Sequence, residues 1–344
     1  SCRCCGGRGF LTLTLPFSMI KVFICVVTAS RREEESMIKP TLQRSRGNLH
    51  VVHLESEQLR VAILPEIGCK IASIVYKEND FEVLARPLGM KKTDDPAKLY
   101  ARAYPGAPFD QYDLSGIDDC IPTIDPCHVE KLGRLSDHGD AWSRPWNVFE
   151  ENLSERSVKA FFRLSTIPLY FERHMRLEGN SLRLDYRLLN ESIDEHPWLW
   201  ALHGLCHYEP DAVLSWPGPY TLFNAHGDED FAFDMQQLKQ VPKEQAYKFY
   251  LQDPVPKGEA SITYPTQGVR LSLHWDASLF PYLGGWINTG GSAGSRCIAL
   301  EPTNGFYDSL ERAIQNEKVG RIAPGGELTW QVRLDFDAIG TALS

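Results

Sequence analysis

The chain contains 344 residues, of which 43% are hydrophobic and 24% charged, and its formal net charge is −9. This composition is typical of a globular protein and excludes a disordered or fibrous chain. The acidic balance disfavours nucleic acid or an anionic membrane surface as a partner, and no apolar run is long enough for a transmembrane helix. Small molecules and other proteins remain as partners.

Residues 1–45 differ from the rest of the chain in composition. They combine a Cys/Gly/Arg-rich start, two short apolar runs and the charged stretch RREEE. Cys2, Cys4 and Cys5 lack the second ligand pair that a zinc site would need. We interpret 1–45 as a disordered or non-native extension, with Met37 as a plausible start, and place one domain over 46–344. The scattered cysteines of that domain favour buried thiols in a reduced, cytoplasmic protein.

Short strands are predicted along the whole domain. The first three cover 51–54, 59–64 and 70–76, and apolar residues alternate with polar ones over 181–189 after a Gly-Asn turn. Further strand candidates fill the C-terminal third. Helical periodicity is confined to 308–320, with Gly320 as the predicted end, and to a second short segment within 234–252 that Pro242 interrupts. The pattern predicts an all-β domain of roughly twenty strands without internal repeats.

Two segments rich in polar side chains are candidates for ligand contact. The segment 116–125 contains Asp118 and Asp119, which are either solvated turn residues or rim contacts to ligand hydroxyls. The segment 137–148 places His138, Trp142 and Arg144 within a few positions of one another. Such a mixture of aromatic and hydrogen-bonding groups is unusual in a structural loop, and sugar rings stack well on indoles.

Two further segments contain residues that could transfer protons. His203 lies in the apolar run WLWALHGL, where a histidine satisfied within the core is the alternative to a catalytic one. His207 follows at metal-ligand spacing, but that spacing works on a helix rather than on a strand. Glu301 ends the apolar run CIAL before a proline, so it is either a salt-bridged strand end or a rigid, partly desolvated base.

The order of these motifs resembles the aldose 1-epimerase, or galactose mutarotase-like, family. The motifs are LPEIGCKI, GIDDCIPTI, HGDAWSRPW, ALHGLCHY, GGWINTGG and IALEPTNGFYDSLERA, and the resemblance covers residues 50–340. It implies a β-supersandwich with an open sugar cleft, and an isomerase that interconverts the α and β anomers of a hexose. On this resemblance His203 is the catalytic acid and Glu301 the catalytic base.

The remaining site residues follow from the resemblance and from the loop composition. His138 matches the family's substrate-binding histidine, although its loop reads His-Gly-Asp rather than His-Gly-Gly. Asp119 occupies the approximate position of the family's Asn-Arg pair, so we expect altered sugar specificity. Trp142 and Arg144 are expected to contact the sugar. The family needs neither metal nor cofactor, and we expect a monomer or homodimer. Two alternatives stay open: a hexose-phosphate 1-epimerase, with Arg102 and Arg144 as phosphate ligands, and a non-catalytic sugar-binding protein.

Overall fold

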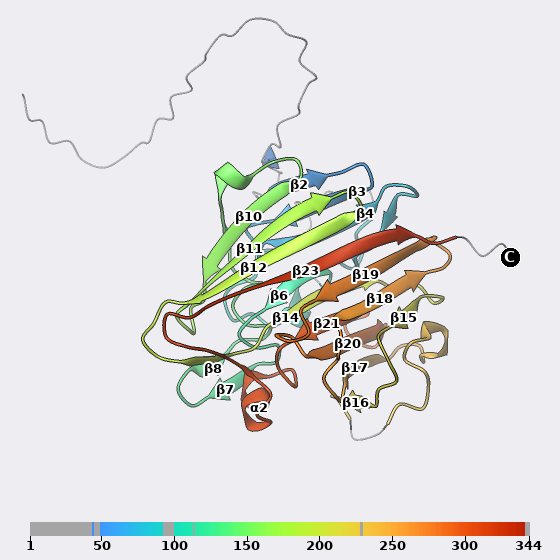
Figure 1. Cartoon of the computed structure of the whole chain (residues 1–344). Helices are drawn as coiled ribbons and strands as arrows, with labels where there is room; N and C mark the ends of the chain where they lie inside the picture. The colour runs from blue at the N-terminus through green and yellow to red at the C-terminus, as the bar shows by residue number, and fades with distance from the viewer. Residues whose placement is uncertain (1–42, 45–48, 92–99, 113, 228–229, 341–344) are drawn as a thin grey trace, which may run out of the picture. The chain divides into compact units, whose positions relative to one another are not determined.

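Two large antiparallel sheets form the domain. The structure is a computed structural model that describes residues 43–44, 49–91, 100–112, 114–227 and 230–340. These residues all lie within one compact unit, Lys39–Ser344. The sheets are packed in two layers (Figure 1), and the all-β prediction is confirmed. The extension predicted over 1–45 lies outside the described residues except for Gln43–Arg44, which pair with the next strand.

The first sheet contains eleven strands. Their order across the sheet is β1-β2-β3-β4-β6-β14-β21-β20-β17-β16, and β5 also pairs with β4. The strands predicted over 59–64 and 70–76 have these bounds in the structure. In chain order the strands are β1 (Gln43–Arg44), β2 (His50–Glu55), β3 (Leu59–Leu64), β4 (Lys70–Tyr76), β5 (Phe81–Glu82), β6 (Gly116–Cys120), β14 (Ala201–His207), β16 (Leu222–Asn224), β17 (Ala246–Leu251), β20 (Tyr282–Thr289) and β21 (Arg296–Thr303).

The second sheet contains eight strands, in the order β15-β18-β19-β23-β12-β11-β10-β9. The predicted Gly179–Asn180 turn joins β11 to β12, whose register pairs Glu178 with Ser181. The strands are β9 (Asn147–Val148), β10 (Ser157–Arg163), β11 (Leu169–Glu178), β12 (Ser181–Asn190), β15 (Val213–Ser215), β18 (Glu259–Tyr264), β19 (Val269–Trp275) and β23 (Glu327–Ala338).

Helices are few and short. The predicted helix over 308–320 is α2 (Leu310–Gln315), whose N-cap Ser309 accepts a hydrogen bond from the Arg312 N–H. Its predicted end at Gly320 is wrong, because Gly320 begins a strand. The second predicted helix is only a 3-10 turn, η3 (Leu238–Gln240), followed by β17. The remaining elements are η1 (Phe109–Gln111), η2 (Glu150–Asn152) and two small sheets, β7 (Cys127–Val129) with β8 (Gly133–Leu135) and β13 (His196–Trp198) with β22 (Gly320–Ile322).

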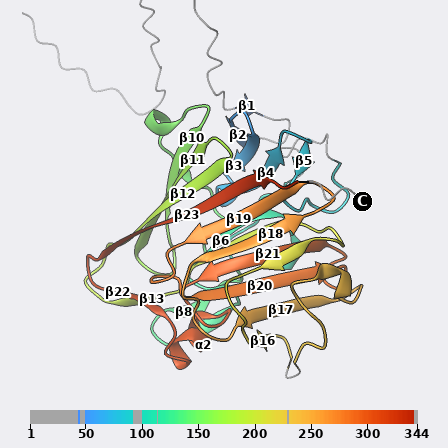
Figure 2. The ribbon, with the colours of Figure 1, turned by 45° about the vertical axis from the view of Figure 1, so that its right-hand side comes forward.

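The main core lies between the two large sheets (Figure 2). Alternate residues of each strand point into it, as the period of two requires. From the first sheet, Ile117, Leu202 and Leu300 meet Leu273 and Phe336 of the second sheet around one small void. The residues between them in sequence therefore point to the outer face of the eleven-stranded sheet, and this alternation selects the side chains of the site. Among the described residues, no helix is long and apolar enough to cross a membrane.

Candidate active site

The outer face of the eleven-stranded sheet has an open pocket with a volume of about 170 Å³. Strands β14, β17, β20 and β21 form its floor, and η1 and the loop that contains His138 form one wall. Its lining combines carboxylates, histidines and apolar side chains: Phe109, Asp110, Leu114, Ile124, Asp125, Asp137, His138, His203, Leu205, His226, Lys248, Trp286, Ser292, Cys297, Glu301 and Asp308. Polar groups that converge on a partly apolar pocket are typical of a small-molecule site.

His203 and Glu301 lie beside each other on the pocket floor. The register that pairs Ala201 with Thr303 and Cys206 with Ile298 places His203 of β14 opposite Glu301 of β21. The His203 Nε2 atom is 3.9 Å from the Glu301 Oε1 atom. The two residues are therefore neighbours on adjacent strands, so a molecule in the pocket would lie over the pair rather than between its members.

His203 is held in a dry, electropositive environment. Its side chain is 9% exposed, and its Nδ1 atom has no hydrogen-bond partner among the described residues. Burial, together with the charges of His138, Lys248 and Lys70, lowers the pKa of His203 well below its usual value. The free imidazole is therefore neutral at physiological pH. Once protonated, the His203 ring is a stronger acid than an ordinary imidazolium.

Glu301 has one anchored oxygen and one free oxygen. Its Oε2 atom accepts a short hydrogen bond from the Lys248 ammonium of β17. Its Oε1 atom is buried without a hydrogen-bond partner among the described residues. Strand β20 lies between β17 and β21, and at Gly284 a Cβ atom would come within 3.5 Å of Glu301 Oε2 and 3.1 Å of the Tyr250 ring. The missing side chain at Gly284 therefore leaves room mainly for the Tyr250 ring, which packs beside Glu301.

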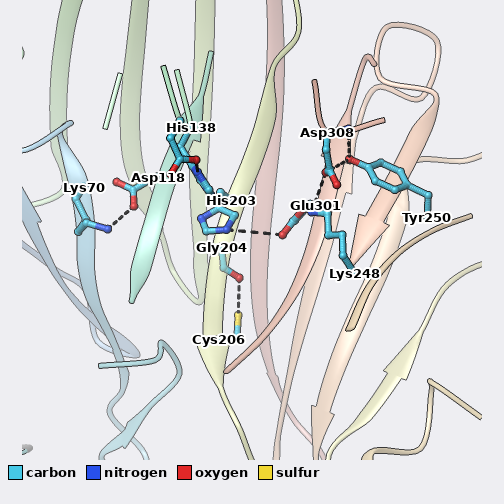
Figure 3. A network of polar contacts seen from close by, with 11 residues as sticks. Lys70, Asp118, His138, His203, Gly204, Cys206, Lys248, Tyr250, Glu301 and Asp308 are labelled. Atoms are coloured by element: carbon cyan, nitrogen blue, oxygen red, sulfur yellow. Dashed lines mark hydrogen bonds and ion pairs between the residues drawn. The ribbon is translucent and has the colours of Figure 1, made fainter. Parts of the chain in front are cut away.

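Lys248 is the centre of a buried polar network that the sequence analysis missed (Figure 3). Its ammonium is also 3.4 Å from Asp308, whose Oδ1 atom accepts a 2.7 Å hydrogen bond from the Tyr250 hydroxyl. Burial opposes the charged form of Lys248, but Asp308 and Glu301 outweigh it and raise its pKa. Lys248 therefore stays charged and holds both carboxylates in place.

The loop that contains His138 is fixed against the end of β6. The His138 N–H donates to the Ile124 carbonyl (2.6 Å), and the Asp140 N–H donates to the Ile121 carbonyl (2.7 Å). At Gly139 (φ +73°) a Cβ atom would lie 2.1 Å from the Ile121 carbonyl oxygen, so only glycine fits.

The His138 ring is oriented by two contacts. Its Nδ1 atom is 2.7 Å from Asp137 Oδ1, and its ring stacks on Phe109 with centroids 4.0 Å apart. Partial burial raises the pKa of Asp137, but the hydrogen bond and charge of His138 outweigh this and the net pKa is lowered. The Phe109 ring also meets His203 edge-on at 5.1 Å. Both histidine rings are thus held rigidly at the pocket.

Asp119 does not lie at the pocket, which corrects the expectation that it contacts a sugar. Neighbouring residues of a strand point to opposite faces, and Asp118 takes the outer face of β6. Asp119 points into the core, where it accepts hydrogen bonds from Arg173 of the other sheet (2.6 Å) and from the Trp200 indole (2.9 Å). Asp118 is itself paired with Lys70 and is fully buried. Asp119 thus joins the two sheets.

Trp142 and Arg144 also lie away from the pocket lining. Trp142 is buried behind Phe109, and its indole N–H donates to the Asp137 carbonyl (2.9 Å). Arg144 donates to the Ser165 hydroxyl at 2.7 Å. The density of aromatic residues in this loop therefore supports the pocket wall from behind, and Phe109, which the sequence analysis did not select, provides the aromatic surface.

The charge of the pocket lining is predominantly negative. Five carboxylates line it, and Lys248 is the one Lys or Arg among the lining residues that the structure describes. Burial and the nearby Asp308 raise the pKa of Asp125. Arg102 and Arg144, the expected phosphate ligands, do not line the pocket, and Arg102 is paired with Glu66 at 2.9 Å.

One group of side chains could hold a metal ion. Ligand atoms of Cys120, His138 and His203 all lie within 4.8 Å of one another. His203 and Glu301 could also transfer protons without an ion, because a carboxylate and an imidazole can act as base and acid.

Comparisons with known proteins bear on the fold. Neither a scan against protein-family models nor a search of curated proteins finds a match. Among solved structures, the Slr1438 protein of Synechocystis superposes with a TM-score of 0.66 at 16% identity, covering 90% of this chain and 100% of that one. A Klebsiella pneumoniae protein provisionally named an aldose 1-epimerase superposes with a TM-score of 0.64 at 15% identity, covering 86% of this chain and 81% of that one. A galactose mutarotase-like protein from Lactobacillus casei superposes with a TM-score of 0.60 at 15% identity, covering 83% of this chain and 100% of that one. The chain therefore has the galactose mutarotase-like β-supersandwich fold.

Proposed function

We propose that this protein is an aldose 1-epimerase, which interconverts the α and β anomers of a free hexose. The observation that supports this most directly is the free Oε1 atom of Glu301, buried at the pocket and 3.9 Å from His203 Nε2. A buried carboxylate oxygen without a partner is costly unless a ligand hydroxyl completes its hydrogen bonding. The anomeric O1–H of a sugar supplies such a donor.

The proposed reaction needs one base and one acid. Glu301 Oε1 takes the proton from the anomeric O1–H, the electrons of that bond form the C1=O1 double bond, and the C1–O5 bond breaks. The His203 imidazolium gives its proton to O5 as that bond breaks. Rotation about C1–C2 then presents the other face of the aldehyde, and the reverse transfers close the ring and restore both groups.

The surroundings of the pair suit this division of roles. The Lys248 ammonium holds Glu301 Oε2 and leaves Oε1 facing the pocket, where it can accept a proton. The electropositive environment lowers the pKa of His203, so its imidazolium gives up its proton readily to a weakly basic ether oxygen. The lowered pKa also means that a smaller fraction of His203 is protonated at neutral pH. His138, aligned by Asp137, is placed to bind a sugar hydroxyl.

The negative lining favours an uncharged sugar over a phosphorylated one. A phosphate in the pocket would meet five carboxylates, and the one lining ammonium is already paired with Glu301 and Asp308. Like charges at close range in a partly dry site oppose binding. We therefore favour a free hexose over a hexose phosphate.

Polarimetry of freshly dissolved sugars tests the proposal. Single anomers of several free hexoses, each with and without protein, should reach rotational equilibrium faster with protein, after subtraction of the spontaneous rate. The matching hexose 6-phosphates should show little acceleration. Acceleration confined to the phosphates would favour the alternative epimerase, and sugar binding without any acceleration would favour a non-catalytic sugar-binding protein.

A further inference from the structure

We propose that Cys120, His138 and His203 form a site for a soft or borderline divalent cation such as Zn²⁺, and that this ion switches off the proposed epimerase. The inhibitory role rests on the proposed function, whereas the metal site does not. The three residues come from β6, from the loop fixed on the end of β6, and from β14, which pairs with β6. The pairing of these strands and the anchoring of this loop therefore bring the three side chains together.

The geometry leaves room for one ion. Three atoms that lie at most 4.8 Å apart always have a point within about 2.8 Å of all of them. Zinc bonds to nitrogen are about 2.0–2.1 Å long and those to sulfur about 2.3 Å. Shifts of up to about 0.8 Å in each side chain would therefore bring all three ligand atoms into bonding distance. The set of one sulfur and two nitrogens suits Zn²⁺ or Co²⁺ and disfavours Mg²⁺ and Ca²⁺, which bind oxygen.

One ligand is already in the state that a metal requires. The His203 Nδ1 atom is buried without a hydrogen-bond partner among the described residues, while Nε2 lies toward Glu301. The Asp137 carboxylate accepts from His138 Nδ1–H, so Nε2 is the His138 nitrogen that would bind the metal. A histidine oriented by a carboxylate in this way is the common arrangement in metal sites. Burial raises the pKa of the Cys120 thiol, which would lose its proton as the metal binds. Figure 3 shows His203 between His138 and Glu301.

The consequence for catalysis follows from the protons of imidazole. An imidazolium carries a proton on each nitrogen. A metal on His203 Nδ1 leaves one proton on the ring, so the acid form cannot exist while the metal is bound. Metal on His138 Nε2 also removes a ligand for sugar hydroxyls. Bound Zn²⁺ should therefore inhibit, and a chelator should restore activity.

The binding test uses the full chain without sugar. Cys2, Cys4, Cys5 and Cys25 are replaced by serine in every variant to remove the thiols outside the described residues. Calorimetric titration with Zn²⁺ should show one site, and Co²⁺ should give a thiolate-to-metal charge-transfer band with the visible absorption of tetrahedral cobalt. Cys120→Ser should abolish the band and the site. Asp137→Ala should weaken binding by ~10–100-fold, as expected for a residue that orients a ligand.

A matched control removes a different thiol. Cys127 is half-buried next to His128 and outside the pocket, so Cys127→Ser should keep the site and the band. Retention of the zinc site in Cys120→Ser, or a cobalt spectrum without the thiolate band, would overturn the proposal. Even if Cys120→Ser does not fold, the cobalt spectrum of the chain that keeps Cys120 shows whether a thiolate binds the metal.

Activity measurements then separate the two proposals. If the proposed function is right, mutarotation of the parent chain should fall at saturating Zn²⁺ and recover with EDTA, and uninhibited turnover by the zinc-loaded chain would overturn the inhibitory role. Absence of mutarotation without zinc would reject the proposed function and leave the metal site standing. Absence of zinc binding would reject the site and leave the function standing.

Discussion

Lys248 and Glu301 form a buried ion pair across strand β20. The ammonium holds one carboxylate oxygen, and the other oxygen is free at the pocket next to His203. An ion pair that fixes half of a carboxylate and leaves the other half without a partner is poor as a device for stability alone. It fits a base that must be ionised, oriented and available to a ligand.

Glu301→Gln and His203→Asn should each lower the catalysed mutarotation rate by ~10²-fold or more, because each removes one proton-transfer group. Sugar binding should weaken less than turnover, since most hydroxyls of a hexose are contacted elsewhere. Polarimetry and melting temperature are measured together, with Glu311→Gln on α2 as the control. Loss of melting temperature with unchanged turnover per folded molecule would show that the pair is structural.

Lys248→Met should act mainly on turnover rather than on apparent sugar affinity. Without the ammonium, Glu301 loses its anchor and Asp308 loses a partner, so the base becomes misplaced. The variant also leaves two carboxylates buried with less compensation, which should cost about 3–5 kcal/mol of stability. Adding Glu301→Gln to Lys248→Met should recover part of that stability, which urea unfolding can measure. A change in KM with kcat unchanged would contradict this role.

The strand pattern was predictable because each face of a sheet has one kind of environment. The alternation over 181–189 corresponds to β12, with Leu182 and Leu184 in the core and Arg183 and Asp185 outside it. The partners of the site could not be obtained in the same way. Pairing between β14 and β21 depends on contacts distant in sequence, and His203 and Glu301 were linked beforehand only by a family resemblance.

The errors of prediction also have local causes. Asp118 and Asp119 were read either as solvated turn residues or as rim contacts to a ligand. They belong instead to strand β6, and in a strand only one of two neighbours can face the pocket. Lys248 gave no signal, because a lysine between Tyr247 and Phe249 is what the solvent face of an ordinary strand contains. Phe109 lies in a segment without periodicity, so nothing in the sequence distinguished it from other loop aromatics.

Asp119→Asn should destabilise the protein without removing a sugar contact. Asp119 pairs with Arg173 in the core, and both side chains are fully buried. Loss of one partner of such a pair costs about 3–5 kcal/mol, because the other charge stays buried and unpaired. Unfolding in urea gives this value, and calorimetric titration with sugar gives the affinity of the folded fraction. A large loss of affinity with normal stability would restore Asp119 as a ligand contact.

Asp185 should make the stability of the second sheet sensitive to acid. Partial burial raises its pKa, but hydrogen bonds from Gln331, Arg183 and Arg176 outweigh this, and the net pKa is lowered. A group whose pKa is lower in the folded state stabilises the protein above its unfolded-state pKa of about 3.9, and this contribution disappears as the pH falls through the folded-state value.

Asp185→Asn should therefore be less stable than the parent chain at pH 7, by on the order of 1 kcal/mol. The difference should shrink as the pH falls below about 4, where the parent loses the same interactions by protonation. Urea unfolding at pH 7, 5, 4 and 3 measures it, and Glu151→Gln, which removes an exposed carboxylate, measures the effect of net charge alone. A difference that stays constant down to pH 3 would mean that the Asp185 carboxylate does not need its charge for these contacts.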